Sequence, residues 1–271
     1  MTRLLAAIAC LSLFSFAKAE LKQDIEFAKA GDVSLTLDAF TPEGDGPFPA
    51  CILVHGGAWT KGDKTTFIKP LFDPLSKAGF TWFTINYRLA PQYQWPACGD
   101  DVAAAIAWVR AHAEEYKVDP KRIALVGESA GGHLVSWAGL TDKGNPPLAA
   151  VVAFYAPNDL VTLMKKRKEL GGLGDLLGAT ELNDETWDKL GKISPIGQVR
   201  PAAPPFLLIH GDKDGRVPLE QSHLFQQRLK DSGNVCDLIT VPGGDHGMGG
   251  WSKLGSDYQE QMVLWLKDKL K

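Results

Sequence analysis

The chain has 271 residues, of which 45% are hydrophobic and 23% are charged, and its formal net charge at pH 7 is −3. This length and composition fit one globular domain with a sizeable apolar core. The sequence shows no basic stripe of the kind that binds nucleic acid, and its one basic run, residues 165–168, fits a solvated helix face.

The first 19 residues have the pattern of a secretory signal peptide. Arg3 gives a short basic start, residues 4–16 form an apolar run, and "AKA" provides a cleavage site. The apolar run is shorter than the roughly 20 residues that a membrane-spanning helix needs, and the residues before Cys10 match a lipoprotein signal poorly. We therefore expect residues 1–19 to be a signal peptide, residues 20–271 to form the mature domain without a stable membrane span, and the protein to be secreted or periplasmic.

Strand-like and helix-like segments alternate along the rest of the chain. The expected strands are residues 33–40, 50–54, 80–85, 122–126, 149–155, 206–209 and 236–241, and the expected helices are residues 100–116, a segment from about 129, 219–229 and about 257–270. This alternation predicts the α/β class, with a mainly parallel, doubly wound sheet covered by helices on both faces. The first of these strands fits an antiparallel addition at the sheet edge.

Residues 158–204 interrupt the alternation. The segment is rich in glycine and lies between two expected strands, so we interpret it as an insertion over the carboxyl edge of the sheet. Open α/β sheets place their sites at that edge. Two interpretations remain, a short lid over the site and a surface excursion.

The stretch "LVGESAGGHL" places Ser129 in a G-x-S-x-G motif between an expected strand and an expected helix. A serine at such a turn projects its hydroxyl away from the backbone, and Gly127 and Gly131 allow the strand and the helix to approach. The N–H of Ala130 would then lie at a helix N-terminus, where it can donate to an oxyanion. The pattern predicts that Ser129 is a nucleophile.

A serine nucleophile needs a base and an orienting carboxylate. Asp214 follows one later strand in "HGDKDGRVP", and His246 follows the next in "PGGDHGMGG". The order serine, acid, histidine along the chain is the one that G-x-S-x-G hydrolases use. We expect His246 to accept the Ser129 proton and Asp214 to hold the other ring nitrogen.

Several other residues are weaker alternatives for these roles. Asp212 is the main alternative to Asp214 as the acid, and Asp159 and Asp245 are less favoured alternatives. His210 lies at the end of an expected strand, and we interpret it as a hydrogen-bonded structural residue. We interpret Glu128 as having a local structural role beside the serine.

"HGGAW" at residues 55–59 follows an earlier strand and supplies a glycine-rich backbone. We expect the N–H groups of Gly57 and Ala58 to join that of Ala130 in an oxyanion hole. The sequence holds neither a P-loop lysine pattern nor an HExxH or CxxC motif. The three cysteines of the mature chain are odd in number and widely spaced. We therefore expect no metal, no cofactor and no disulfide scaffold.

Five segments together resemble the α/β-hydrolase superfamily, and within it the HGGxW-type esterases related to hormone-sensitive lipase and to bacterial feruloyl and acetyl esterases. They are "HGGAW", "NYRLAP" at 86–91, "VDPKRIALVGESAGGH" at 118–133, "HGDKDGRVP" and "GGDHG". The resemblance implies hydrolysis of carboxylic esters through an acyl-enzyme at Ser129, on short-acyl, acetyl or feruloyl esters of small molecules or carbohydrates. Trp59 and Trp251 flank the two glycine-rich loops and are candidates for substrate contact.

Two other functions compete with ester hydrolysis. The HGGxW branch includes arylformamidases, so an amide hydrolase is one alternative, although an exported protein fits a cytosolic metabolite poorly. A non-catalytic binding protein on the same fold is another, and the presence of Ser129, Asp214 and His246 together argues against it.

Overall fold

The computed structural model of the protein describes residues 18–271. The expected signal peptide, residues 1–19, lies outside the described residues except for its last two positions.

Eight strands form one sheet in the order β1-β2-β4-β3-β5-β6-β7-β8. β1 and β2 are antiparallel to each other, and β2 is antiparallel to β4, whereas all other neighbours are parallel. The strands are β1 Glu20–Ala30, β2 Val33–Thr41, β3 Phe48–Val54, β4 Thr81–Ile85, β5 Val118–Glu128, β6 Ala150–Phe154, β7 Phe206–Gly211 and β8 Cys236–Val241.

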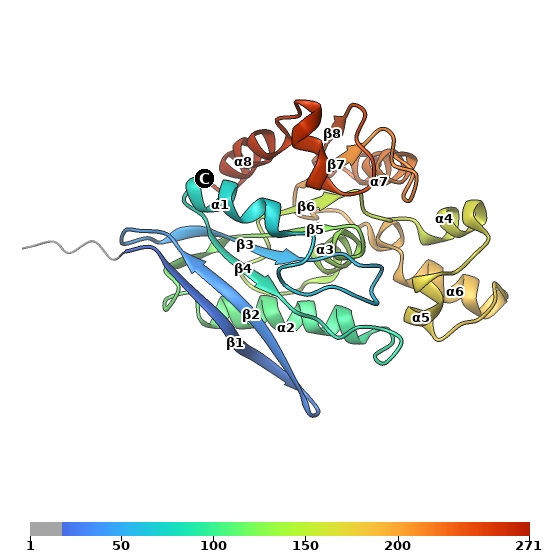
Figure 1. Ribbon diagram of the computed structural model, residues 1–271, viewed down its shortest axis with the longest axis horizontal. Coiled ribbons are helices and arrows are strands. Elements are labelled where there is room, and N and C mark those ends of the chain that lie inside the picture. Colours follow the sequence, from blue (N-terminus) through green and yellow to red (C-terminus); the bar gives the residue numbers. More distant parts are fainter. Residues whose placement is uncertain (1–17) are drawn as a thin grey trace, which may run out of the picture.

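Helices cover both faces of the sheet (Figure 1). Buried side chains of α2, α3 and α7 pack on one face, and those of α1 and α8 pack on the other. The helices are α1 Phe72–Lys77, α2 Ala97–Ala111, α3 Ala130–Thr141, α4 Leu160–Arg167, α5 Gly172–Leu177, α6 Asp184–Ile193, α7 Glu220–Asp231 and α8 Tyr258–Lys269, with short 3-10 segments at η1 Lys69–Leu71, η2 Pro195–Gln198 and η3 Met248–Leu254.

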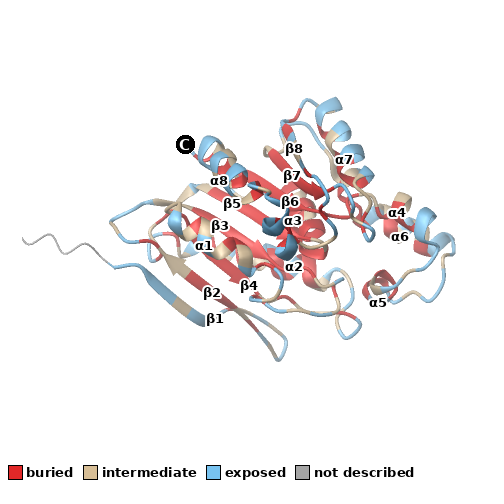
Figure 2. Cartoon of the chain, turned by 45° about the horizontal axis from the view of Figure 1, so that its top comes forward, coloured by how far each residue is buried: buried red, intermediate tan, exposed pale blue. Residues whose placement is uncertain are grey.

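The central strands are apolar on both sides because successive residues of a strand point to opposite faces. In β3, Ile52 and Val54 pack with the α2 side of the core, whereas Cys51 and Leu53 pack with the α8 side. Figure 2 shows the resulting buried centre of the sheet. This two-sided core fixes the register in which Val54 pairs with Gly127 of β5, so the loops after β3 and β5 lie side by side.

The α/β class and the mainly parallel sheet expected from the sequence are confirmed. β2 is antiparallel as expected, but it is not the edge strand, because β1 pairs outside it. β1 was not expected, because its residues are mostly exposed, many of them are charged, and they lack the apolar alternation of a half-buried strand. The short helix α1 was also not expected.

The segment between β6 and β7 contains α4, α5, α6 and η2. Figure 1 shows these helices gathered beyond the end to which the parallel strands point. Asp159 caps α4 by accepting the N–H of Thr162, and Asn183 caps α6 by accepting the N–H of Thr186. The insertion thus stands at the edge of the sheet where the loops after the parallel strands also meet.

Candidate active site

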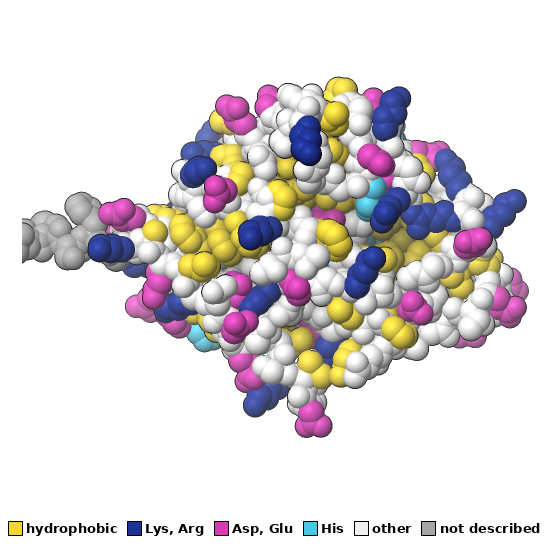
Figure 3. Space-filling model, in the orientation of Figure 1, with side chains coloured by type: hydrophobic (Ala, Val, Ile, Leu, Met, Phe, Trp, Pro, Cys, Tyr) yellow, Lys and Arg dark blue, Asp and Glu magenta, His cyan; other side chains and the backbone are white. Residues whose placement is uncertain are grey.

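A cavity of about 750 Å³ opens at this edge of the sheet. Residues of the loops after β3, β5, β7 and β8 line it, together with Leu163, Arg167 and Leu173 of the insertion. On the surface, apolar side chains lie beside a histidine in this region, with lysine and arginine side chains around them (Figure 3). The cavity joins segments that are far apart in the sequence.

Ser129 occupies a sharp turn between the end of β5 and the start of α3, with φ 53° and ψ −117°. This is an unfavourable region for a residue with a side chain, and such strain typically costs about 1–3 kcal/mol. The turn is so tight that a Cβ on Gly127 would overlap the carbonyl of Gly131. The Ser129 N–H donates to the carbonyl of Phe154 over 2.9 Å, which fixes the turn against β6. The hydroxyl is thereby directed into the cavity.

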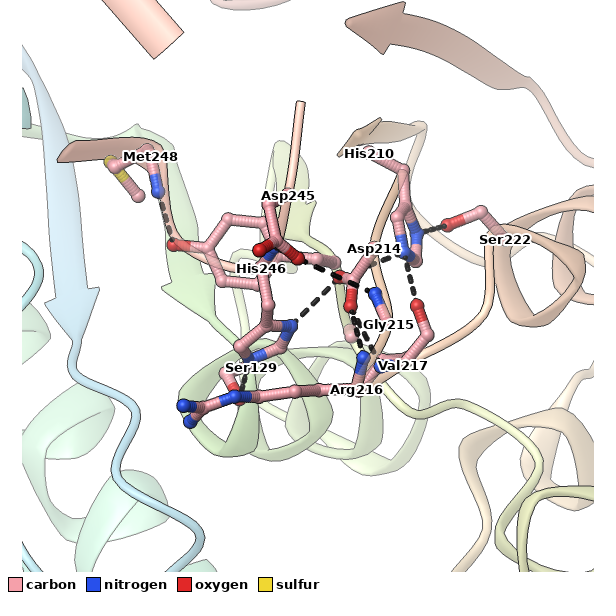
Figure 4. Close-up of polar contacts among 12 residues, drawn as sticks. Ser129, His210, Asp214, Gly215, Arg216, Val217, Ser222, Asp245, His246 and Met248 are labelled. Atoms are coloured by element: carbon pink, nitrogen blue, oxygen red, sulfur yellow. Dashed lines mark hydrogen bonds and ion pairs between the residues drawn. The ribbon is translucent and has the colours of Figure 1, made fainter. Parts of the chain in front are cut away.

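His246 and Asp214 form a hydrogen-bonded chain with Ser129 (Figure 4). His246 Nε2 lies 3.0 Å from Ser129 Oγ, and His246 Nδ1 lies 2.7 Å from Asp214 Oδ2. His246 comes from the loop after β8 and Asp214 from the loop after β7, so neighbouring parallel strands deliver the two side chains to the same edge.

Asp214 is enclosed and held by several donors. Its side chain has no exposed surface, and its Oδ1 accepts the N–H groups of Arg216 and Val217, each over 2.8 Å. His210 Nε2 lies 3.3 Å from Oδ2. Burial acts to raise the pKa of Asp214, but the hydrogen bonds from His210 and His246 lower it by more, so the pKa stays well below its usual range. The carboxylate is therefore ionised at neutral pH.

The competing acids are occupied elsewhere. Asp212 accepts the N–H of Gly243 over 2.7 Å, Asp159 caps α4, and Asp245 accepts the N–H of its neighbour His246. None of these three contacts the His246 ring. His210 donates from Nε2 to the carbonyl of Val217, and its Nδ1 lies 2.7 Å from Ser222 Oγ, as expected for a structural residue.

The expected oxyanion donors line the same cavity as Ser129. The loop after β3 has positive φ at Gly57, Ala58 and Trp59, and a Cβ on Gly57 would overlap the carbonyl of Lys61. Within residues 18–271, the N–H groups of Gly57, Ala58 and Ala130 have no hydrogen-bond acceptor. Unpaired N–H groups at a cavity wall are suited to bind an oxygen atom of a ligand.

Glu128 joins the serine turn to the loop after β3. Its carboxylate accepts the N–H of Gly56, and the residue is only 3% exposed. Burial raises the pKa of Glu128 to about 7, although the Gly56 hydrogen bond acts to lower it. The sequence indicated a local structural role for Glu128, but the contact with a loop 72 residues away was not foreseen.

The two tryptophans proposed for substrate contact lie in different surroundings. Trp59 lines the cavity, and its Nε1 lies 3.3 Å from His133 Nδ1. Trp251 is 1% exposed, donates from Nε1 to the carbonyl of Asp245, and does not line the cavity. The expectation for Trp251 is therefore corrected: it packs in the core against Tyr258 and supports the His246 loop.

Within residues 18–271, no group of three or more His, Cys, Asp and Glu side chains is placed to hold a metal ion. The cysteines of this part of the chain, Cys51, Cys98 and Cys236, are buried and free. No helix in the same range is long and apolar enough to cross a membrane.

Comparisons with known proteins agree with this arrangement. The family model described as BD-FAE matches residues 37–229. Esterase LipC of Mycobacterium tuberculosis is 34% identical over 74% of this chain and 53% of its own length. An acetylxylan esterase of Xylanibacter ruminicola is 26% identical over 98% of this chain and 55% of its own length.

Among solved structures, a truncated form of a carbohydrate esterase from gut microbiota superimposes with a TM-score of 0.82. It is 27% identical, and the match covers 94% of this chain and 96% of that one. The chain thus spans about half the length of the curated relatives it matches and nearly the whole of this structural neighbour.

Proposed function

Because the chain belongs to the BD-FAE family of α/β-hydrolases, we propose that it is a serine hydrolase of carboxylic esters. The observation that carries this proposal is the unbroken hydrogen-bonded chain from Ser129 Oγ through His246 to Asp214, at 3.0 and 2.7 Å. Catalytic serines are activated by a base that a third group orients.

In the first half of the reaction, His246 Nε2 takes the proton of Ser129 as Oγ attacks the ester carbonyl carbon. Asp214 accepts the Nδ1–H of the ring, fixes its tautomer and stabilises the imidazolium that forms. The tetrahedral intermediate collapses, its bond to the alcohol oxygen breaks, and His246 gives its proton to the departing alcohol. The acyl group is then held on Ser129.

The negative oxygen of the intermediate binds the N–H groups of Gly57, Ala58 and Ala130. The three residues line the cavity, and these N–H groups have no acceptor in residues 18–271, so no hydrogen bond within this part of the protein is lost when the oxyanion forms. Glu128 holds the Gly56 N–H and so positions the loop that carries two of these donors. A single such donor typically contributes a factor of about 10²–10³ to turnover.

In the second half, His246 takes a proton from water, and the resulting hydroxide attacks the acyl carbon. Collapse of the second intermediate releases the carboxylic acid and returns the proton to Ser129. The proposed chemistry uses these side chains and water alone.

For substrates, we propose short-acyl esters of small molecules or carbohydrates. Relatives named acetylxylan esterase and carbohydrate esterase support this class. The cavity also has the size of an ordinary small-molecule site, at about 750 Å³. Trp59 at the cavity wall is a candidate for substrate contact.

The test is a panel of p-nitrophenyl acetate and butyrate, methyl ferulate, acetylated xylan and N-formylkynurenine, each assayed with residues 20–271 and with Ser129→Ala. We expect Ser129-dependent hydrolysis of the acetyl esters. Hydrolysis of N-formylkynurenine alone would replace the proposal with an amide hydrolase, and binding without turnover of any compound would point to a non-catalytic protein.

We also propose that the protein is secreted or periplasmic. The basic start, apolar run and small-residue cleavage site within residues 1–19 support this location. Expression of the full chain and mass measurement of the exported protein test the proposal, with Glu20 expected as the first residue. A protein retained in the cytoplasm with its N-terminus uncleaved would contradict it.

A further inference from the structure

Three basic side chains line the cavity from three separate segments. Lys61 follows β3, Arg167 ends α4 of the insertion, and Arg216 lies in the loop after β7. All three residues are exposed and lie at the mouth of the cavity. They surround the entrance to Ser129 without being near one another in the sequence.

These cations are not paired with carboxylates. Within residues 18–271, none of the three forms an ion pair, whereas the adjacent Lys166 pairs with Glu220. Among the described residues, the one acidic residue that lines the cavity is Glu128, which is buried and bonded to the Gly56 N–H. The mouth of the cavity therefore carries excess positive charge.

The two arginines are also positioned relative to each other. The Arg167 guanidinium donates to the backbone carbonyl of Arg216. Burial lowers the pKa of Arg167, and the positive charge of Arg216 lowers it further, while Asp214 opposes both effects. Asp214 offsets only part of the positive charge at the mouth, because it is one carboxylate against three cations and is itself bonded to His246 and His210.

The position of Arg216 indicates which part of a substrate would meet this charge. Arg216 is two residues from Asp214, and its N–H donates to that carboxylate. In Figure 4 its side chain extends from the Asp214 loop toward the side of Ser129 and His246. Since His246 protonates the departing alcohol in the proposed reaction, the alcohol part of the substrate is the part expected to reach a cation beside the Asp214 loop.

We propose that Arg167 and Arg216, supported by Lys61, select esters whose alcohol part carries a carboxylate, such as acyl groups on an acidic carbohydrate. The inference rests on the proposed ester hydrolysis and adds the charge of its substrate. Arginine suits this role because its planar guanidinium forms two parallel hydrogen bonds with a carboxylate, and a cationic entrance raises the local concentration of anions.

The experiment compares two acetyl esters that differ in one charge, 4-acetoxybenzoate and 4-acetoxybenzamide, with each rate divided by its uncatalysed rate. The neutral ester reports on ester hydrolysis alone, and the ratio of the two values of kcat/KM reports on charge selection. We expect a ratio of about 10 or more at low ionic strength, since each cation typically contributes a factor of about 2–5. The ratio should fall toward 1 in 0.5 M salt.

The variant Arg167→Gln/Arg216→Gln should reduce the ratio to about 2–5, the factor that Lys61 alone contributes, mainly through KM for the anionic ester. Lys165→Gln is the matched control, because it removes a charge from the same helix at a residue that does not line the cavity. It should keep the wild-type ratio. Thermal denaturation of each variant verifies the fold.

A wild-type ratio near 1, or a high ratio that persists in the double variant, would overturn the inference while leaving hydrolysis of the neutral ester intact. Mono-p-nitrophenyl glutarate and p-nitrophenyl pentanoate differ by a carboxylate on the acyl part. If the enzyme prefers the charged member of this pair more strongly than it prefers the charged acetoxy ester, the inference is also overturned, because the charge is then recognised on the acyl side. If neither acetyl ester is hydrolysed, the proposed function itself fails, and this inference fails with it.

Discussion

The loops after β5, β7 and β8 and the insertion between β6 and β7 face the same cavity, but they are held in place differently. The loops are fixed by backbone bonds to neighbouring strands and to each other, such as Ser129 N–H to Phe154 and Lys213 N–H to Gly244. The insertion consists of short helices, of which α4 and α6 have side-chain caps, and it contributes Leu163, Arg167 and Leu173 to the wall. The proposed chemistry therefore depends on the backbone geometry of the loops, whereas we expect substrate choice to depend on side chains of the insertion and the cavity mouth.

The largest effect is expected at Ser129 and His246, which act as one unit. Ser129→Ala and His246→Ala should each lower kcat for p-nitrophenyl acetate by about 10⁴–10⁶-fold, and the double variant should lose no more than either single variant. Initial rates of the three variants measure this. Losses that multiply in the double variant would show that the two residues act independently, contrary to their 3.0 Å contact.

The next effect distinguishes two aspartates in one loop. Asp214→Asn should lower kcat by about 10³–10⁴-fold because it leaves the His246 ring without a carboxylate partner. Asp212→Asn is the matched control and should change kcat by less than about 3-fold, since within residues 18–271 the Asp212 carboxylate hydrogen-bonds only the Gly243 N–H, which a neutral amide oxygen can still accept. Side-by-side kinetics decide the matter, and a larger loss for Asp212 would refute the assignment of the acid.

The raised pKa of Glu128 predicts that the free energy of unfolding depends measurably on pH. The folded protein keeps the Glu128 proton up to about pH 7, whereas the unfolded chain loses it near the ordinary value of 4.5. The folded state therefore binds more protons between these values, and the free energy of unfolding decreases as pH rises through this window. The contribution is at most about 3 kcal/mol.

Glu128→Gln keeps an acceptor for the Gly56 N–H and removes the titration. Urea denaturation of the wild type and the variant at pH 5 and pH 8 measures the difference. The free energy of unfolding of the variant minus that of the wild type should be larger at pH 8 than at pH 5. If the two proteins keep a constant difference at both values, Glu128 does not titrate in this window.

The smallest effect is expected from the insertion. Leu173 is 2% exposed and lines the cavity from α5, so Leu173→Ala enlarges the cavity and leaves Ser129 unchanged. We expect KM for p-nitrophenyl butyrate to change relative to that for the acetate by about 2–5-fold, as the burial of one methylene group typically does, with kcat nearly constant. A loss of kcat as large as that of Asp214→Asn would mean that the insertion positions the reacting groups.

The sequence predicted those features that depend on local chemistry. Apolar runs located the central strands, and the strand–glycine–helix pattern around Ser129 located the turn. The positions of Asp214 and His246 after strands predicted that they would meet at one edge, since parallel strands end on the same side. The preference for Asp214 over Asp212 followed from its place in the motif and agrees with the contact observed at 2.7 Å.

Features that depend on long-range side-chain direction could not be predicted. β1 is a polar edge strand without apolar alternation, and Trp251 follows the His246 loop in sequence but points into the core. Glu128 reaches Gly56, and Arg167 reaches Arg216, only because of loop conformations that local pattern does not determine. The cationic mouth of the cavity therefore became visible only in three dimensions.

The most direct test of the central claim is to trap the nucleophile. The protein is treated with diethyl p-nitrophenyl phosphate, which phosphorylates activated serines, and the modified peptide is identified by mass spectrometry. We predict one diethylphosphoryl group on Ser129, loss of esterase activity in proportion to labelling, and little labelling of His246→Ala. A protein that hydrolyses esters but is labelled at another residue, or remains active when Ser129 is fully labelled, would contradict the account.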